Sequence, residues 1–278
     1  MNAVATSLTP LVADSITHLG AAARGAVAVT GSHGGIAAAA IAVSKGVRAA
    51  VFNDAGLGRD DAGVAGLPLL DDFAIAAAAV AHTSARIGEG AETMAHGVIS
   101  HANETALVLG VRPGQPCRDA ATALARNTAT VADTPPPAPD TRRRLRAAPV
   151  AVWLMDSASE IRPADAGAIV ITGSHGGLPG RDPAHAVKAP VLLAAFNDAG
   201  VGKDGAGIAR LAALQARGIA GVAVAHTSAR IGEAESTYRH GVISAVNAAA
   251  AVLGARIGQP LQSLVAALEK DPVAGGRP

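Results

Sequence analysis

The segment AVAVTGSHGG at residues 26–35 recurs as AIVITGSHGG at residues 168–177, and this pair decides the fold. Each copy is a short apolar run that stops at a glycine-rich loop, as a buried parallel strand does. Three more identical segments follow in the same order: FNDAG (52–56 and 196–200), AVAHTSARIGE (79–89 and 223–233) and HGVIS (96–100 and 240–244). The sequence therefore predicts two tandem copies of one unit.

We divide the chain into a first copy at residues 1–125, a linker at 126–149 and a second copy at 150–278. The linker contains the proline-rich segment TPPPAP, which predicts an extended spacer. It also holds an arginine run, expected to be solvated: Arg142, Arg143, Arg144 and Arg146. The second copy carries two extra residues between Leu178 and Ala195, and its tail after Asp271 is expected to be disordered.

In each copy, apolar runs of strand length alternate with helical stretches. The expected strands are 26–29, 49–52 and 75–81 in the first copy and 168–171, 192–196 and 219–225 in the second. A helix is expected after each first strand, and a last helix is expected to end at Gly110 and at Gly254. Asp60 and Asp204 are placed to cap the helix before the third strand. The predicted fold class is α/β, with a parallel sheet in each strand–helix unit, right-handed crossovers and a pseudo-two-fold relation between the copies.

The composition limits the classes of function. With 23 basic and 22 acidic residues and a net charge of +1, the chain shows no basic face for nucleic acid. Aromatic residues make up only 2%, too few for base stacking or a large planar cofactor, so we expect a small polar ligand and no cofactor. The single cysteine, Cys117, fits a reducing compartment. No apolar run reaches the ~18 residues of a membrane span, so we expect a cytoplasmic protein without a membrane partner.

Three repeated polar loops follow the predicted strands directly. Ligands of such sheets bind outside the carboxyl ends of the strands, so these loops are the expected site. The strands differ between the copies while the polar loops do not, which favours a function for the loops over a purely structural role. The expected substrate-binding residues are Gly34, Gly35, His33, Asn53, Ser84 and Arg86, with Gly176, Gly177, His175, Asn197, Ser228 and Arg230 in the second copy.

The leading hypothesis is a metal-independent enzyme that acts on a small carboxylate-bearing substrate, as a hydrolase of an amide or cyclic amide. The nucleophile would be Ser32 or Ser174, since a serine needs only a base and an orienting acid nearby. The base would be His82 or His226, oriented by Asp54 or Asp198. Backbone N–H groups of the glycine-rich loops would form the oxyanion hole.

Arg86 and Arg230 are placed to clamp a carboxylate or phosphate of the ligand. The alternative is an ion pair with Glu89 or with Glu233. The expected partner is accordingly a small anionic or carboxylate-bearing molecule, and a homo-oligomer is also considered.

Two other functions stay open. One is a metal-dependent lyase or hydrolase that uses His33, Asp54 and His82 or their counterparts as ligands. The other is a non-catalytic protein that binds a small anion. A repeated polar stripe, expected on the last helix, is interpreted as a seam between the halves or a lining of the site: Thr93, His96, Ser100 and Asn103, with Thr237, His240, Ser244 and Asn247. Asp14 and Asp156 are a further candidate pair, with helix capping as the alternative.

Overall fold

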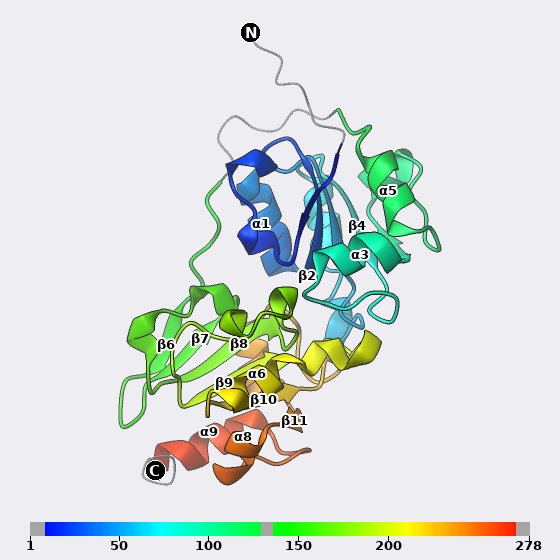
Figure 1. Ribbon diagram of the computed structural model, residues 1–278. Coiled ribbons are helices and arrows are strands. Elements are labelled where there is room, and N and C mark those ends of the chain that lie inside the picture. Colours follow the sequence, from blue (N-terminus) through cyan, green and yellow to red (C-terminus); the bar gives the residue numbers. More distant parts are fainter. Residues whose placement is uncertain (1–8, 129–135, 271–278) are drawn as a thin grey trace.

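The computed structural model describes residues 9–128 and 136–270, which form two mostly parallel β-sheets in tandem (Figure 1). The first sheet has the order β1-β2-β3-β4-β5. Its strands are β1 (Leu11–Ala13), β2 (Val27–His33), β3 (Ala49–Asn53), β4 (Ala76–Val80) and β5 (Ile99–Ala102). The first four are parallel, and β5 pairs antiparallel with β4. The three strands expected from the sequence are confirmed as parallel neighbours.

The second sheet repeats this plan and adds one edge strand, in the order β11-β10-β9-β8-β7-β6. Its strands are β6 (Arg143–Arg146), β7 (Val152–Met155), β8 (Ile169–His175), β9 (Leu193–Asn197), β10 (Ala220–Val224) and β11 (Ile243–Val246). Strands β7 to β10 are parallel, whereas β6 and β11 pair antiparallel at the two edges. Each unit is thus an α/β layer structure with a parallel centre.

Helices cover both faces of each sheet because the buried strands are apolar on both sides. In the first unit, α1 (Ile36–Lys45) and α2 (Gly66–Asp71) pack on the face that carries Ala28 and Phe52. The opposite face, with Val27 and Val29, packs against α4 (Glu104–Val108) and α5 (Cys117–Leu124). No helix among the described residues has the length and apolar character that a membrane crossing demands.

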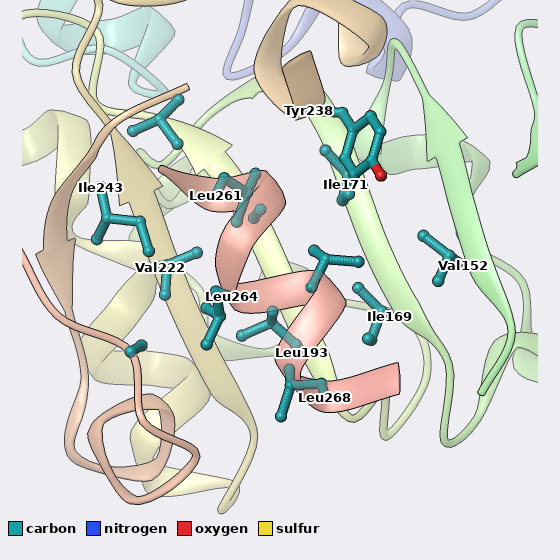
Figure 2. Packing of buried hydrophobic residues seen from close by; sticks show 14 of the residues in the cluster. Val152, Ile169, Ile171, Leu193, Val222, Tyr238, Ile243, Leu261, Leu264 and Leu268 are labelled. Carbon is teal, nitrogen blue, oxygen red and sulfur yellow. The ribbon is translucent and has the colours of Figure 1, made fainter. Parts of the chain in front are cut away.

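The second unit is closed in the same way by α6 (Arg210–Ala216), α8 (Ala248–Val252) and α9 (Leu261–Lys270). Figure 2 shows α9 laying Leu261, Leu264 and Leu268 onto the strands of this sheet, in the core that includes Ile169 and Val222. The spacing of three and four residues puts these leucines on one helix face. This amphipathic helix closes the end of the unit.

The expected last helix is wrong in both copies. In the first unit it divides into α3 (Gly90–His96), β5 and α4, and in the second into α7 (Ala234–His240), β11 and α8. Strand pairing overrides the helical spacing here, since Ile99 pairs with Val80 and Ile243 with Val224. The polar stripe is therefore not a helix face.

The segment after the GSHGG motif differs between the units. In the first it is α1, an alanine-rich helix that ends at Gly46 in the left-handed conformation. The expected second-unit helix is absent, and two short 3-10 turns, η6 (Pro179–Arg181) and η7 (Pro183–His185), take its place. Proline has no backbone N–H to continue an α-helix, so prolines at 179, 183 and 190 prevent one.

The arginine run lies in the sheet rather than in a linker, because residues 143–146 form the edge strand β6, but Arg143, Arg144 and Arg146 are exposed there as expected. Arg142, beside it, pairs with the buried Asp165 at 2.8 Å and lies 4.4 Å from the ring centre of Trp153. Asp60 and Asp204 cap no helix; both have positive φ and face arginines across the junction. The predicted tail after Asp271 lies outside the described residues.

Candidate functional site

The repeated strand-end loops of the two units meet each other. The amide of Arg59 donates to the carbonyl of His226 at 2.8 Å, and the amide of Lys203 donates to the carbonyl of His82 at 2.9 Å. Gly56 and Gly200 lie against each other between these contacts. A small buried apolar cluster completes the junction: Ala55, Ala62, Ile87, Ala199, Ala206 and Ile231.

This junction gives a structural reason for the unchanged loops. The loops contact the other unit, and the backbone contacts of Arg59 with His226 and of Gly56 with Gly200 have counterparts with the units exchanged. A change in a loop therefore alters a contact in the interface as well as the unit that carries it. The likeness of the loops is explained by packing, without requiring that every polar side chain in them act on a ligand.

The glycine-rich loop is shaped by a bulge in the sheet. Val29 pairs with Val51 and His33 with Asn53, so residues 30–32 lie opposite a single residue of β3. Gly31 packs so closely on the segment after β4 that a β-carbon there would collide with the backbone of Gly88 and Glu89. The second unit has the same bulge between Ile171 and His175.

The N–H groups proposed for an oxyanion hole are already used by the fold. The amide of Gly34 donates to the carbonyl of Asn53 at 3.0 Å, and the amide of Gly35 donates to Nδ1 of His33 at 3.1 Å. The amides of Gly176 and Gly177 are engaged in the same way by Asn197 and His175. The amides of these four glycines are thus bonded within the fold and are not free to bind an oxyanion.

His33 and His175 approach each other across the junction, with ring centres 6.4 Å apart. Burial lowers the pKa of His33 to about 4 and the pKa of His175 well below its ordinary value, so both rings are neutral at pH 7. Because Nδ1 of each ring accepts a backbone N–H, the ring proton is assigned to Nε2. Both rings line a small polar cavity of about 40 Å³.

The structure joins the predicted bases to their predicted orienting acids. Nδ1 of His82 lies 2.9 Å from Oδ1 of Asp54, and the equivalent distance for His226 and Asp198 is 3.0 Å. Burial alone would raise the pKa of Asp54, but hydrogen bonds from His82 and from the Gly56 amide outweigh it and lower that pKa. The hydrogen bond to Asp54 raises the pKa of His82, against the opposite effect of its burial.

The proposed nucleophiles are engaged elsewhere. Oγ of Ser32 accepts the amide of Ile16 at 2.9 Å and donates to Oγ of Ser15 at 3.5 Å. Oγ of Ser174 accepts the amide of Ala158 at 2.9 Å. No hydrogen bond links either serine to a histidine among the described residues. Only the histidine–aspartate half of the proposed relay is assembled.

Both arginines form the ion pairs that were the alternative to a ligand clamp. Arg86 donates to Glu89 at 2.8 Å, to Glu92 at 2.9 Å and to Asp204 of the other unit at 3.0 Å. Arg230 pairs with Asp60 at 2.7 Å, and its Nη1 lies 3.8 Å from Glu233. Their charges are thus met by carboxylates of the junction rather than left for an anion.

The remaining polar candidates have local structural partners. The amide group of Asn53 donates to Ala85 and accepts from Ala55, and Oγ of Ser84 donates to Ala81. Asn197 and Ser228 repeat these bonds in the second unit. Asn103 caps α4, and Asp14 accepts the first amide of α3, Gly90, at 3.0 Å. Asp156 does the same for α7.

A pocket of about 390 Å³ opens beside these loops on the side of the second unit. Its hydroxyl groups come from both units: Ser15, Thr17, Ser157, Ser159 and Ser174. Its imidazole and cationic groups are His18, His175, His185, Lys188 and Arg210. Among the described residues that line it, none carries a carboxylate, although Asp156 lines the small neighbouring cavity. The pocket thus offers hydrogen-bonding hydroxyls and imidazoles together with the cations Lys188 and Arg210.

His18 and His185 approach across the pocket from different units, with ring centres 5.2 Å apart. Burial lowers the pKa of His18, and the neighbouring His185 lowers it further. Sequence reasoning missed His18, His185, Lys188 and Arg210 because it looked for residues shared by the copies, and these are not shared. The signal that could have found two of them, His185 and Lys188, is the insertion in the second copy together with its prolines.

The metal alternative needs its ligands gathered at one point. Among the residues that the structure describes, no three or more His, Cys, Asp or Glu side chains are close enough to share a metal ion. Of the proposed ligands, His82 bonds Asp54, whereas Nδ1 of His33 is bonded to its own loop. Cys117 is buried, and burial raises the pKa of its thiol to about 12.

The chain matches no known family, no curated protein and no solved structure.

Proposed function

We propose that the protein binds a small anionic molecule, bearing a carboxylate or a phosphate, in the pocket beside the unit junction. The observation that carries this proposal is the pocket lining, which combines hydroxyls, imidazoles and two cations without a carboxylate. Lys188 and His185 are exposed at the pocket, where a mobile anion can reach them. This is the alternative of a non-catalytic binding protein. The residues proposed to bind the anion are now Lys188, His185 and Arg210 rather than the repeated Arg86 and Arg230.

The size and chemistry of the pocket narrow the ligand. A volume of about 390 Å³ lies within the roughly 300–1,000 Å³ of typical small-molecule sites. The lining has no Phe, Tyr or Trp side chain for stacking a nucleobase, but hydroxyls that can donate to and accept from a ligand hydroxyl. A short hydroxylated acid or a sugar phosphate would satisfy both kinds of group.

The test is a thermal-shift screen of small carboxylates and phosphates, followed by calorimetry on the compounds that stabilise the protein. A hit should bind the double variant His185→Asn, Lys188→Met at least tenfold more weakly. The matched control is Lys45→Met, a lysine at the end of α1 and outside the pocket lining, which should bind normally. Equal affinity of the double variant and the control would place the ligand elsewhere.

We also infer that the units are related by a pseudo-two-fold axis, as in a fused homodimer. The reciprocal bonds between Arg59 and His226 and between Lys203 and His82 support this relation, since a two-fold axis repeats each contact. The close pairs Gly56–Gly200 and His33–His175 would lie beside the axis. A crystal structure in which one unit superposes on the other by a rotation far from 180° would overturn it.

A second candidate function is hydrolysis of an amide or cyclic amide, for which the two histidine–aspartate pairs are the specific support. Asp54 holds Nδ1 of His82, which directs the other ring nitrogen toward accepting a proton from water. The resulting hydroxide would add to the amide carbon, and the proton would pass to the leaving nitrogen. This version uses water rather than Ser32 as nucleophile, because the serine is bonded to Ile16.

Turnover on a panel of amides tests this candidate. His82→Asn and His226→Asn should each lower kcat, and His240→Asn is the control because that histidine is exposed. Turnover that survives the loss of both pairs would remove the histidines from the chemistry.

A further inference from the structure

The two units use different residues at one equivalent position, Gly66 and Arg210. Each is the first residue of a helix, α2 or α6. The amide of Gly66 donates to the carbonyl of Gly34 at 2.9 Å, and the amide of Arg210 donates to the carbonyl of Gly176 at 2.8 Å. The backbones therefore match, and only the side chains differ.

In the first unit, helix α1 occupies the space beside this position. A β-carbon at Gly66 would lie 2.7 Å from Cβ of Ala39 and 2.6 Å from the carbonyl oxygen of Gly35. Glycine is required there because the helix packs directly on the backbone. No pocket of the second unit's kind can form at this place while α1 fills it.

In the second unit, α1 has no counterpart, and the side chain of Arg210 fills part of the space. Its guanidinium donates to the carbonyls of Gly177, at 3.1 and 2.9 Å, of Ala186 at 2.8 Å and of His185 at 3.4 Å. It also lies 4.7 Å from the ring centre of Phe196. The arginine thus holds the loop that replaces the helix, and both this loop and Arg210 line the pocket.

The charge of Arg210 has no counter-ion in the described parts of the chain. The side chain is only 4% exposed, and every partner that it contacts through a hydrogen bond is a neutral carbonyl. Burial lowers its pKa to about 10, which shows the cost of keeping it charged there. A guanidinium has five N–H donors and these bonds use four, so one N–H of Nη2 is left over on a side chain that lines the pocket.

We propose that each chain binds one anionic ligand, on the second unit's side of the junction only, and that Arg210 is the buried cation that offsets its charge. This inference rests on the proposed function and adds its stoichiometry and its anchor. A buried cation is tolerated at lower cost when an anion is nearby, so the pocket prefers anions over neutral molecules of the same size. The duplicated sequence would otherwise suggest two sites.

Equilibrium dialysis with labelled inorganic phosphate, and with malonate as a carboxylate probe, measures both parts of the proposal on the full chain. Saturation at one phosphate or malonate per chain is expected. Arg210→Met, which keeps the length but not the charge, should weaken binding at least tenfold, and Arg210→Lys should weaken it less. The control is Arg48→Met, because Arg48 is also buried, at 6% exposure, but bonds the carbonyl of Asn127 instead.

The outcomes separate this inference from the proposed function. Two sites per chain, or unchanged binding by Arg210→Met while His185→Asn with Lys188→Met abolishes it, would overturn the inference and leave the pocket as an anion site. No binding of either probe by the wild-type protein at millimolar concentration would overturn both. If Arg210→Met does not fold, Arg210→Lys and the wild-type stoichiometry decide the question.

Discussion

Helix α1 of the first unit and residues 178–192 of the second follow the same GSHGG motif and lead into the same parallel strand. The first is a regular helix that packs into the sheet, and the second is a pair of short turns fixed by prolines and by Arg210. The second lines a pocket of about 390 Å³ beside the junction. The difference lies between two copies that otherwise keep the same sheet.

This contrast indicates different roles for the residues that the two copies share and for those that they do not share. The shared loops carry the interface between the units, where every change would affect two surfaces. The segment between the strands has a different conformation in each copy, a helix in the first and a loop beside a cavity in the second, although Gly180 of that loop also bonds the carbonyl of Gly88 in the first unit. A helix that fills its space gives stability, whereas a loop with a buried cation gives a site at some cost in stability.

The largest expected change in stability tests how closely α1 packs against position 66. Gly66→Ala should destabilise the protein by about 3 kcal/mol, since the new methyl meets the backbone of Gly35 and the side chain of Ala39. Urea unfolding of the wild type and the variant measures the free energy of unfolding. Gly20→Ala is the control, because a β-carbon at Gly20 meets nothing within 4 Å and its φ is −92°. Similar losses in the two variants would mean that α1 is not packed against position 66.

A smaller effect is expected from the second asymmetry of the junction, at Glu92 and its counterpart Ser236. Glu92 is 7% exposed and forms ion pairs with Arg86 and Lys203. Oγ of Ser236 instead accepts a hydrogen bond from the amide of Arg230. Glu92→Ala should cost about 2 kcal/mol, because two partly buried cations lose a shared carboxylate. Ser236→Ala should cost about 1 kcal/mol.

The same unfolding experiment tests whether the ion pairs of Glu92 with Arg86 and Lys203 stabilise the junction. Added salt should reduce the difference between wild type and Glu92→Ala only in part, because buried pairs are screened less than exposed ones. If Ser236→Ala proved as costly as Glu92→Ala, the charge network would add nothing to the junction.

The sheets and the histidine–aspartate pairs could be predicted from the sequence because both depend on short-range patterns. An apolar run that stops at a glycine-rich loop places Val27 and Val29 in a strand, and the ends of neighbouring parallel strands bring Asp54 to His82. The split of the last helix could not be foreseen, since the antiparallel pairing of Ile99 with Val80 is a long-range choice. The pocket could not be predicted either. It depends on the absence of a helix like α1 beside Arg210, and this absence is not evident from local sequence patterns.

The roles of the repeated loops could not be predicted from the sequence either. Glycine-rich loops after a strand predict free N–H groups, yet the amide of Gly34 is taken by Asn53 through the bulge. The sequence predicts Arg86 in a loop that follows a strand, but its partners Glu92 and Asp204 come from other segments. Local spacing fixes which residues stand at an edge, and tertiary packing decides which of their polar groups stay free.

The smallest expected effect is a pH dependence at the His82–Asp54 pair. The pKa of His82 is raised by its bond to Asp54, so its contribution is fully present below the ordinary histidine pKa of 6.5 and is lost as pH rises through the folded value. The pKa of Asp54 is lowered, despite the opposing effect of its burial, so its contribution is present above its ordinary value and lost as pH falls through the folded one. Between these limits both partners are charged, and the pair should contribute less than about 1 kcal/mol.

His82→Asn should therefore be less stable than wild type near pH 6, and this difference in the free energy of unfolding should narrow by pH 8, as measured by urea unfolding at each pH. The exposed His240→Asn serves as the control, and a gap that stays constant from pH 6 to pH 8 would show that His82 contributes by packing on Gly200 rather than by its charge.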